Sequence, residues 1–109
     1  MSKRIVKAKH FLGLLTNAEK NQQRVLLKTA TDEQIKSLSE IVLNLLAGYI
    51  PISHKLRRDL SKHKDKIRGV ADRKIKISTL KQRWNKFPIE VLENIIKITL
   101  KYLTNSGKI

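Results

Sequence analysis

The sequence contains no cysteine and little glycine, proline or aromatic residue. Without cysteine, a disulfide framework, a thiolate metal site and a thiol nucleophile are excluded. Only four glycines are present, and they form no phosphate-binding loop. The three histidines, His10, His54 and His63, have no acid or cysteine cluster beside them, so no metal site is predicted. We therefore expect no cofactor.

Acidic residues are scarce, and four of the nine have a role at a helix start. Asp32 and Glu33 precede one apolar-periodic segment, and Glu90 and Glu93 fall in the first turn of another. No paired carboxylates remain for general acid–base chemistry, and the serines and threonines have no nucleophile motif. We therefore expect a protein that is not an enzyme.

Long apolar runs are also missing. No stretch approaches the roughly 18 apolar residues that a membrane-spanning helix needs. The start Met1-Ser2-Lys3-Arg4 lacks the apolar run and cleavage site of a secretory signal. We expect a protein that is neither secreted nor membrane-spanning, and therefore intracellular.

Positive charge is what the sequence has in excess. Its 109 residues include 24 Lys and Arg against 9 Asp and Glu, which gives a formal net charge of +15. Each cation that meets a phosphate releases condensed counterions, so an excess of this size favours polyanionic partners. It is the usual electrostatic footprint of nucleic-acid binding.

Apolar residues recur at helical spacing along the whole chain, and 40% of all residues are hydrophobic. The pattern predicts an all-α fold, a single domain over residues 1–109 that forms a compact bundle of five or six helices. Residues 72–77 have two interpretations, a loop or a short extended segment, because Ile75 and Ile77 alternate with lysines. The predicted helices cover residues 3–15, 17–29, 32–47, 53–69, 78–84 and 88–103, with 32–47 as the central helix.

Several residues are suited to begin or end these helices. Thr16 with Glu19 and Thr31 with Gln34 have the spacing of a capping box. Gly48 suits the end of the central helix, since Pro51 blocks its continuation. In the second predicted helix we place Gln23 on the polar face and Val25 on the apolar side. The remaining predicted caps are Ser53 and Ser78, and Pro88 suits the first turn of the last helix.

The charge is unevenly distributed. Residues 31–50 carry one base and three acids, whereas residues 51–87 carry thirteen bases and three acids. We call residues 51–87 the basic helical arm. Arg58/Lys62 and Lys62/Lys66 are like charges four apart, which disfavours a helix by roughly 0.2–0.5 kcal/mol per pair. A bound polyanion would relieve this repulsion, although a charge run is also what an ordinary solvated helix face contains.

The predicted helix 53–69 within the arm carries mostly Lys and Arg at its exposed positions, without Asn or Gln. A helix–turn–helix over 32–68 is an alternative, but a recognition helix needs polar base-reading side chains. The composition favours phosphate contact without sequence preference and does not distinguish DNA from RNA. The candidate contact residues are Arg57, Arg58, Lys62, Lys64, Lys66, Arg68, Arg73, Lys74, Lys76, Lys81 and Arg83.

Two apolar features have more than one interpretation. Trp84 lies among cations beside Phe87, so it either stacks on a base or packs at the edge of the core. The last helix, 88–103, is strongly apolar for a terminal helix. It either packs in the core or pairs with another molecule.

Residues 26–76 contain a set of short segments that occur together in a known family. These segments are Leu26-Leu27-Lys28-Thr29-Ala30-Thr31, Gln34-Ile35, Glu40-Ile41, Asn44-Leu45-Leu46, Gly48, Ile50-Pro51, Leu60, His63-Lys64, Ile67-Arg68 and Ala71-Asp72-Arg73-Lys74. With them the chain resembles a family of small basic proteins encoded by Maverick/Polinton-type elements and adenovirus-like double-stranded DNA viruses of invertebrates. In that family a glycine-containing hydrophobic tail often follows the basic region, whereas this chain has residues 83–87 and an apolar helix.

The resemblance implies a viral or transposon origin and a location in the virion or the host nucleus. It implies a protein that coats or condenses the packaged genome, or ties it to the capsid. Two other functions stay open. One is a protein-interaction module, a minor capsid or assembly component that binds an acidic protein or forms a homodimer. The other is membrane binding by the basic amphipathic segment 3–15, which we rank last.

Overall fold

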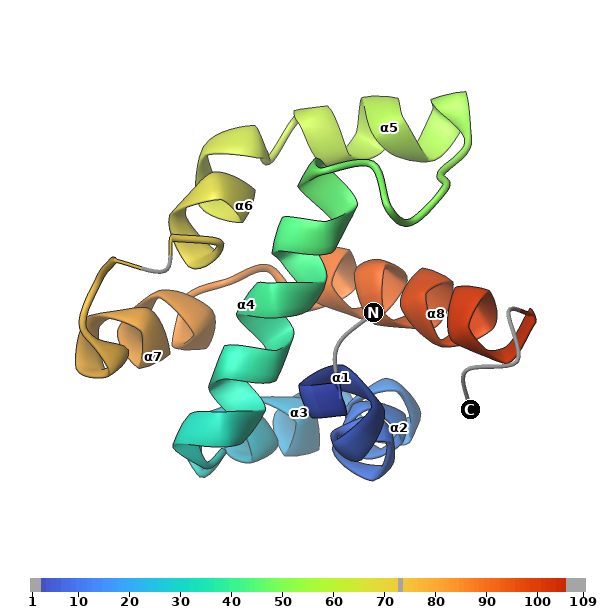
Figure 1. The fold of residues 1–109 in the computed structure, drawn as a ribbon. Coiled ribbons are helices and arrows are strands. Elements are labelled where there is room, and N and C mark those ends of the chain that lie inside the picture. Colours follow the sequence, from blue (N-terminus) through green and yellow to red (C-terminus); the bar gives the residue numbers. More distant parts are fainter. Residues whose placement is uncertain (1–2, 73, 106–109) are drawn as a thin grey trace.

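The helical periodicity of the sequence corresponds to eight α-helices in the computed structural model, which describes residues 3–72 and 74–105. No β-strand occurs in these ranges, and the principal extents are 31 × 29 × 28 Å. The prediction of an all-α globule is confirmed (Figure 1). The helices are α1 (Lys3–Lys7), α2 (Lys9–Asn17), α3 (Lys20–Lys28), α4 (Asp32–Leu46), α5 (His54–Ser61), α6 (Lys64–Val70), α7 (Ile77–Asn85) and α8 (Ile89–Asn105).

The helix number exceeds the prediction because two predicted helices are each broken in two. The segment 3–15 breaks at Ala8, so that α1 packs on α4 while α2 packs on α8. The segment 53–69 breaks at Lys62 and His63, where His63 leaves the helical region with φ −119° and ψ 21°. The second break lets α6 pack on α4 and α7, while α5 lies across the end of α4 (Figure 1).

Helix α4 is the central helix, as predicted, and it contacts α1, α6, α7 and α8. Thr31 caps its start: the Thr31 hydroxyl accepts from the Gln34 N–H (3.1 Å), and the Gln34 side chain accepts from the Thr31 N–H (2.8 Å). Gly48 ends it with φ +83°. The Gly48 N–H donates to the Leu45 carbonyl (3.1 Å) and the Tyr49 N–H to the Asn44 carbonyl (3.0 Å), which is the Schellman pattern.

Both ambiguous apolar features belong to the core. Helix α8 buries seven side chains and packs against α2, α3 and α4, so its apolar face is not a free surface for a partner. The carbonyl of Pro88 accepts the first hydrogen bond of that helix, from Leu92 (3.1 Å). Trp84 is fully buried, its ring centroid lies 4.8 Å from that of Phe87, and it is not available to stack on a base.

The caps at Thr16 and Ser78 were predicted wrongly. Thr16 lies in the last turn of α2, where its hydroxyl donates to the carbonyls of Leu12 (3.3 Å) and Gly13 (3.0 Å). Helix α3 begins after Glu19, whose N–H donates to the Gln22 side chain (3.3 Å). Ser78 lies inside α7, which Lys76 precedes without a side-chain cap.

The structure also tests the predicted Ser53 cap, the predicted faces of α3 and the ambiguous segment before α7. Ser53 is a cap, because its hydroxyl accepts from the Leu56 N–H (3.2 Å). The faces of α3 differ from prediction: Gln23 is 3% exposed and donates to the Leu15 carbonyl (2.6 Å), whereas Val25 is 58% exposed. Residues 72 and 74–76 form no strand, and the Lys74 N–H donates to the Asp72 carboxylate (2.9 Å). None of the described helices is both long and apolar enough to cross a membrane.

Candidate nucleic-acid interface

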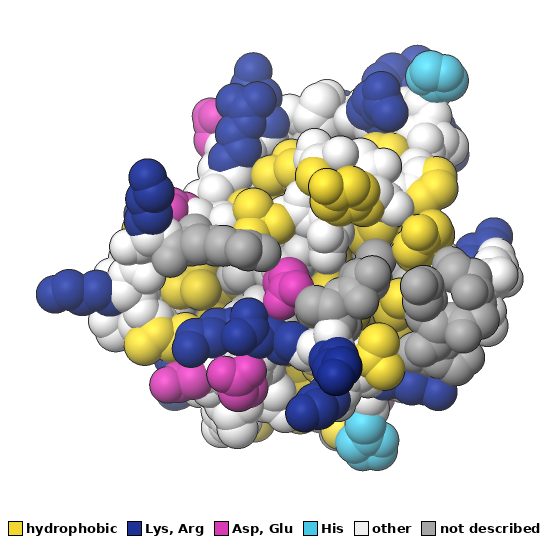
Figure 2. Space-filling view, viewed as in Figure 1, with side chains coloured by type: hydrophobic (Ala, Val, Ile, Leu, Met, Phe, Trp, Pro, Cys, Tyr) yellow, Lys and Arg dark blue, Asp and Glu magenta, His cyan; other side chains and the backbone are white. Residues whose placement is uncertain are grey.

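Helices α5 and α6 direct most of their cations into solvent. Leu60 of α5 and Ile67 and Val70 of α6 are buried, so the opposite sides of both helices face water. Lys and Arg side chains stand out at the top of the molecule, where these helices lie (Figure 2). We call the exposed set the α5–α6 cationic surface: Lys55, Arg57, Arg58, Lys62, Lys64, Lys66 and Arg68.

None of these seven cations forms an ion pair with any residue that the structure describes. Asp59 and Asp65 lie on the same two helices, yet within the described ranges they form no ion pair either. No described carboxylate therefore lies within ion-pair distance of these seven cations. This is the arrangement that a polyanion would find most favourable.

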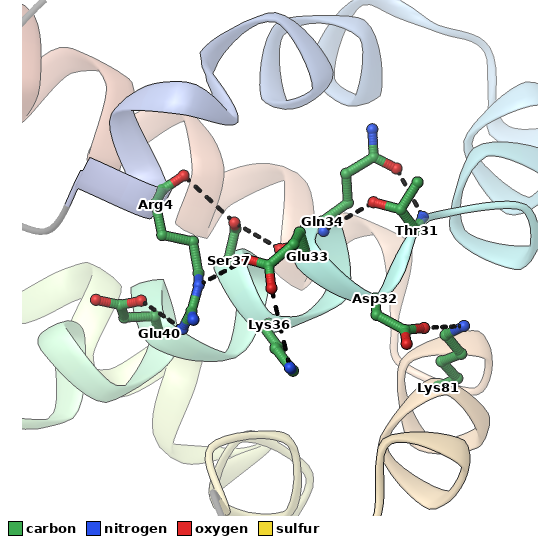
Figure 3. A network of polar contacts seen from close by, with 9 residues as sticks. All are labelled: Arg4, Thr31, Asp32, Glu33, Gln34, Lys36, Ser37, Glu40 and Lys81. Carbon is green, nitrogen blue, oxygen red and sulfur yellow. Dashed lines mark hydrogen bonds and ion pairs between the residues drawn. The ribbon is translucent and has the colours of Figure 1, made fainter.

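The ion pairs among the described residues lie elsewhere, mainly around α4 (Figure 3). Arg4 reaches from α1 to Glu33 (3.1 Å) and Glu40 (3.3 Å). Lys81 of α7 contacts Asp32 at the start of α4 (2.5 Å). The acids of α4 thus serve to join neighbouring helices, and they leave little negative charge to offset the cations of α5 and α6.

Two of the exposed ion pairs shift the pKa values of their side chains. The hydrogen bond and the charge of Lys81 lower the pKa of Asp32 below its ordinary value. Lys20 lies 2.8 Å from Glu90, so that its hydrogen bond lowers the pKa of Glu90, and the same contact raises the pKa of Lys20. These shifts identify contacts between α4 and α7 and between α3 and α8, and they involve none of the α5–α6 cations.

The remaining candidate residues fall into three groups. Lys74 and Lys76 are exposed in the connection between α6 and α7. Arg73 lies outside the described residues. Lys81 and Arg83 already have intramolecular partners, since the Arg83 guanidinium donates to the Gly69 carbonyl near the end of α6 (2.7 Å). The described candidates therefore divide into cations without an ion pair and two, Lys81 and Arg83, that hold helices together.

The structure adds one cation to the candidate set and changes the repulsion argument. Lys55 is exposed on the first turn of α5, and its place among the other cations of that helix was visible in the sequence. Arg58 and Lys62 keep their spacing of one helical turn. Lys62 and Lys66 lie on either side of the break at His63, so the helical rule for like charges does not apply to that pair.

The helix–turn–helix alternative is not supported by the connection between α4 and α5. It runs over residues 47–53, whereas the turn of that motif takes roughly three to four residues. No group of three or more metal-binding side chains is found in the described part of the chain. Comparison with known protein families, curated proteins and solved structures finds no match to this chain.

Proposed function

We propose that this protein is a non-enzymatic nucleic-acid-binding protein that holds phosphates through α5 and α6 and does not read base sequence. The observation that supports it most is the α5–α6 cationic surface, seven exposed Lys and Arg side chains without an ion pair to any described residue. Free cations gain the full benefit of releasing counterions from a phosphate backbone, because no internal acid has to be displaced first.

The lack of sequence preference follows from the side chains available. Lys and Arg form the α5–α6 cationic surface, and neither α5 nor α6 contains an Asn or Gln that would read a base edge. Phosphate contacts fix position on a duplex but carry no sequence information. Lys74 and Lys76 extend the same proposed interface toward α7.

Duplex DNA is the proposed ligand, ahead of RNA, because residues 26–76 resemble proteins of double-stranded DNA viruses and related elements. In that setting the protein would coat or condense the packaged genome, in the virion or the host nucleus. The charge supports binding to a polyanion, and the resemblance supports the choice of DNA.

A salt-titrated binding assay tests this function with three probes: duplex DNA, single-stranded DNA and heparin. For the duplex, we expect log K to fall linearly with log salt, with a slope of about −0.9 per phosphate contacted. Duplex binding that does not change between low and moderate salt would contradict phosphate holding. Heparin bound as tightly as the duplex would show attraction by charge alone and would contradict DNA as the preferred ligand.

A further inference from the structure

An apolar groove lies between the end of α4, the loop that follows it, and helices α5 and α6. Its volume is about 550 Å³. Leu45, Ile50, Leu60 and Ile67 are buried side chains that line it. Figure 2 shows hydrophobic side chains gathered near the end of α4, with Lys and Arg side chains above them. Solvent thus reaches the hydrophobic core at this groove.

Two large hydrophobic side chains are exposed at this end of α4. Leu46 lines the groove and is 51% exposed, and Tyr49, three residues later, is 68% exposed. In a Schellman ending, the residue at the position of Tyr49 usually packs back against the helix. Here it faces solvent instead. An exposed Leu and Tyr beside an open apolar groove form the kind of surface that a partner covers.

The charged residues among those that line the groove are all basic. Arg57 and Lys64 line it, no acid of the described ranges does, and neither cation forms an ion pair with a described residue. On α5 and α6 these two side chains flank the inward-facing Leu60 and Ile67. The groove therefore presents an apolar floor beside two positive charges.

We propose that this groove binds an acidic amphipathic helix of another protein. Apolar side chains of that helix would fill the groove and cover Leu46 and Tyr49, and its flanking carboxylates would pair with Arg57 and Lys64. Charge complementarity selects this occupant. A purely apolar segment would bury the two cations without partners, which is costly. A phosphate backbone would satisfy the cations but would leave Leu46 and Tyr49 in water.

A second copy of this chain fits the groove less well. The acids of its described helices α4 and α8, which are Asp32, Glu33, Glu40, Glu90 and Glu93, all form ion pairs within the chain. Asp59 and Asp65 form none, but they lie on α5 and α6, whose buried apolar side chains pack in the core of their own chain. The apolar face of α8 is buried. The inference goes beyond the proposed function, because it assigns a protein partner to a groove that shares Arg57 and Lys64 with the α5–α6 cationic surface.

The test uses the full-length protein with isotope-labelled methyl groups and a synthetic amphipathic helical peptide, with leucines on one face and glutamates beside them. We expect shifts of the methyl signals of Leu46, Ile50 and Leu60. Leu46→Ser/Tyr49→Ser removes exposed side chains only, and we expect it to weaken peptide binding by at least about tenfold, as for a central anchor. Leu14→Ser/Val25→Ser removes a similar exposed pair on α2 and α3 and should bind as the wild type does.

Three results would overturn the proposal. The first is equal binding of a peptide with lysine in place of glutamate, and the second is an equal loss in both double variants. The third is a dimer of the wild type that Leu46→Ser/Tyr49→Ser abolishes, which would assign the groove to a second copy. Duplex DNA binding by Leu46→Ser/Tyr49→Ser should stay within about twofold of wild type. A large loss there would assign the two side chains to the nucleic-acid interface instead.

The proposed function has its own contradicting result, which is DNA binding by the wild type that does not depend on salt.

Discussion

The indole Nε1 of Trp84 donates a hydrogen bond to the Ser39 hydroxyl over 3.0 Å in the interior of the protein. Both side chains are buried, and the contact joins α7 to the middle of α4. We predict that Ser39→Ala lowers the free energy of unfolding by about 1–3 kcal/mol, because it leaves the buried indole N–H without a partner. Chemical denaturation followed by the fluorescence of this single tryptophan measures the change.

The matched control is Ser78→Ala at an exposed position of α7, which should change stability by no more than about 0.5 kcal/mol. A double-mutant cycle with Trp84→Phe isolates the hydrogen bond from the reduced ring volume. Circular dichroism follows unfolding in this cycle, because the Trp84→Phe variants contain no tryptophan. A coupling of about 0.5–3 kcal/mol is expected, and simple additivity of the two substitutions would contradict the contact.

Two threonines that the sequence presents alike should respond differently to alanine. Thr31 caps α4, so Thr31→Ala should cost about 1 kcal/mol. Thr16 only bonds back to the carbonyls of its own helix, so Thr16→Ala should leave the free energy of unfolding within about 0.5 kcal/mol of wild type. Thermal unfolding followed by circular dichroism compares the variants. An equal loss in both would mean that Thr16 is a cap after all.

Two glycines should respond to alanine with opposite signs. Gly48 has φ +83°, and a side chain in this left-handed region costs about 1–2 kcal/mol, so Gly48→Ala should destabilise. Gly13 lies within α2, and a Cβ added there meets nothing within 4 Å, so Gly13→Ala should stabilise by about 0.5–1 kcal/mol. Urea denaturation midpoints report both changes, and changes of the same sign would contradict the assigned backbone.

Acid should remove the contribution of the contact between Asp32 and Lys81. The pKa of Asp32 is lowered in the folded state, so the ionised carboxylate favours folding. This contribution is present above the ordinary value of 3.8 and is lost as the pH falls below it, through the lowered folded pKa. We predict a shallower acid dependence of stability for Asp32→Asn and for Lys81→Gln.

Low ionic strength is needed for that comparison, because both side chains are exposed and salt screens them. Denaturation midpoints across the acid range give the profile. A wild-type profile retained in both variants would show that the contact does not contribute to folding in solution.

Local signals in the sequence were sufficient to predict where α4 begins and ends. Thr31 and Gln34 at capping-box spacing, and Gly48 before Pro51, predicted both of its ends. An all-α fold was predictable as well, since the apolar residues follow the helical period through most of the chain. These signals act over one or two turns, which is why a single sequence reveals them.

Packing between helices determined the helix breaks and the buried faces, which the sequence alone did not predict. Neither helix break, at Ala8 or at His63, coincides with a proline. Each break depends on the neighbours against which the two resulting helices pack. Gln23 is polar but buried because the Leu15 carbonyl of another helix accepts its hydrogen bond. For the candidate site, composition predicted a basic arm, whereas only the spatial contacts separate Lys81 and Arg83 from the free cations.

The most direct test of phosphate holding by α5 and α6 compares two triple variants that have the same net charge. Arg58→Gln/Lys62→Gln/Lys66→Gln removes three free cations of the α5–α6 cationic surface. The control removes three exposed cations of α2, α3 and α8, by Lys9→Gln, Lys28→Gln and Lys101→Gln. None of the six cations forms an ion pair with a described residue.

The measurement is the slope of log K against log salt for duplex DNA. We predict that the α5–α6 variant lowers the magnitude of the slope by nearly one for each phosphate that it no longer neutralises, whereas the control stays close to wild type. Equal slopes in the two variants would contradict the account, because binding would then depend on the total charge and not on this surface.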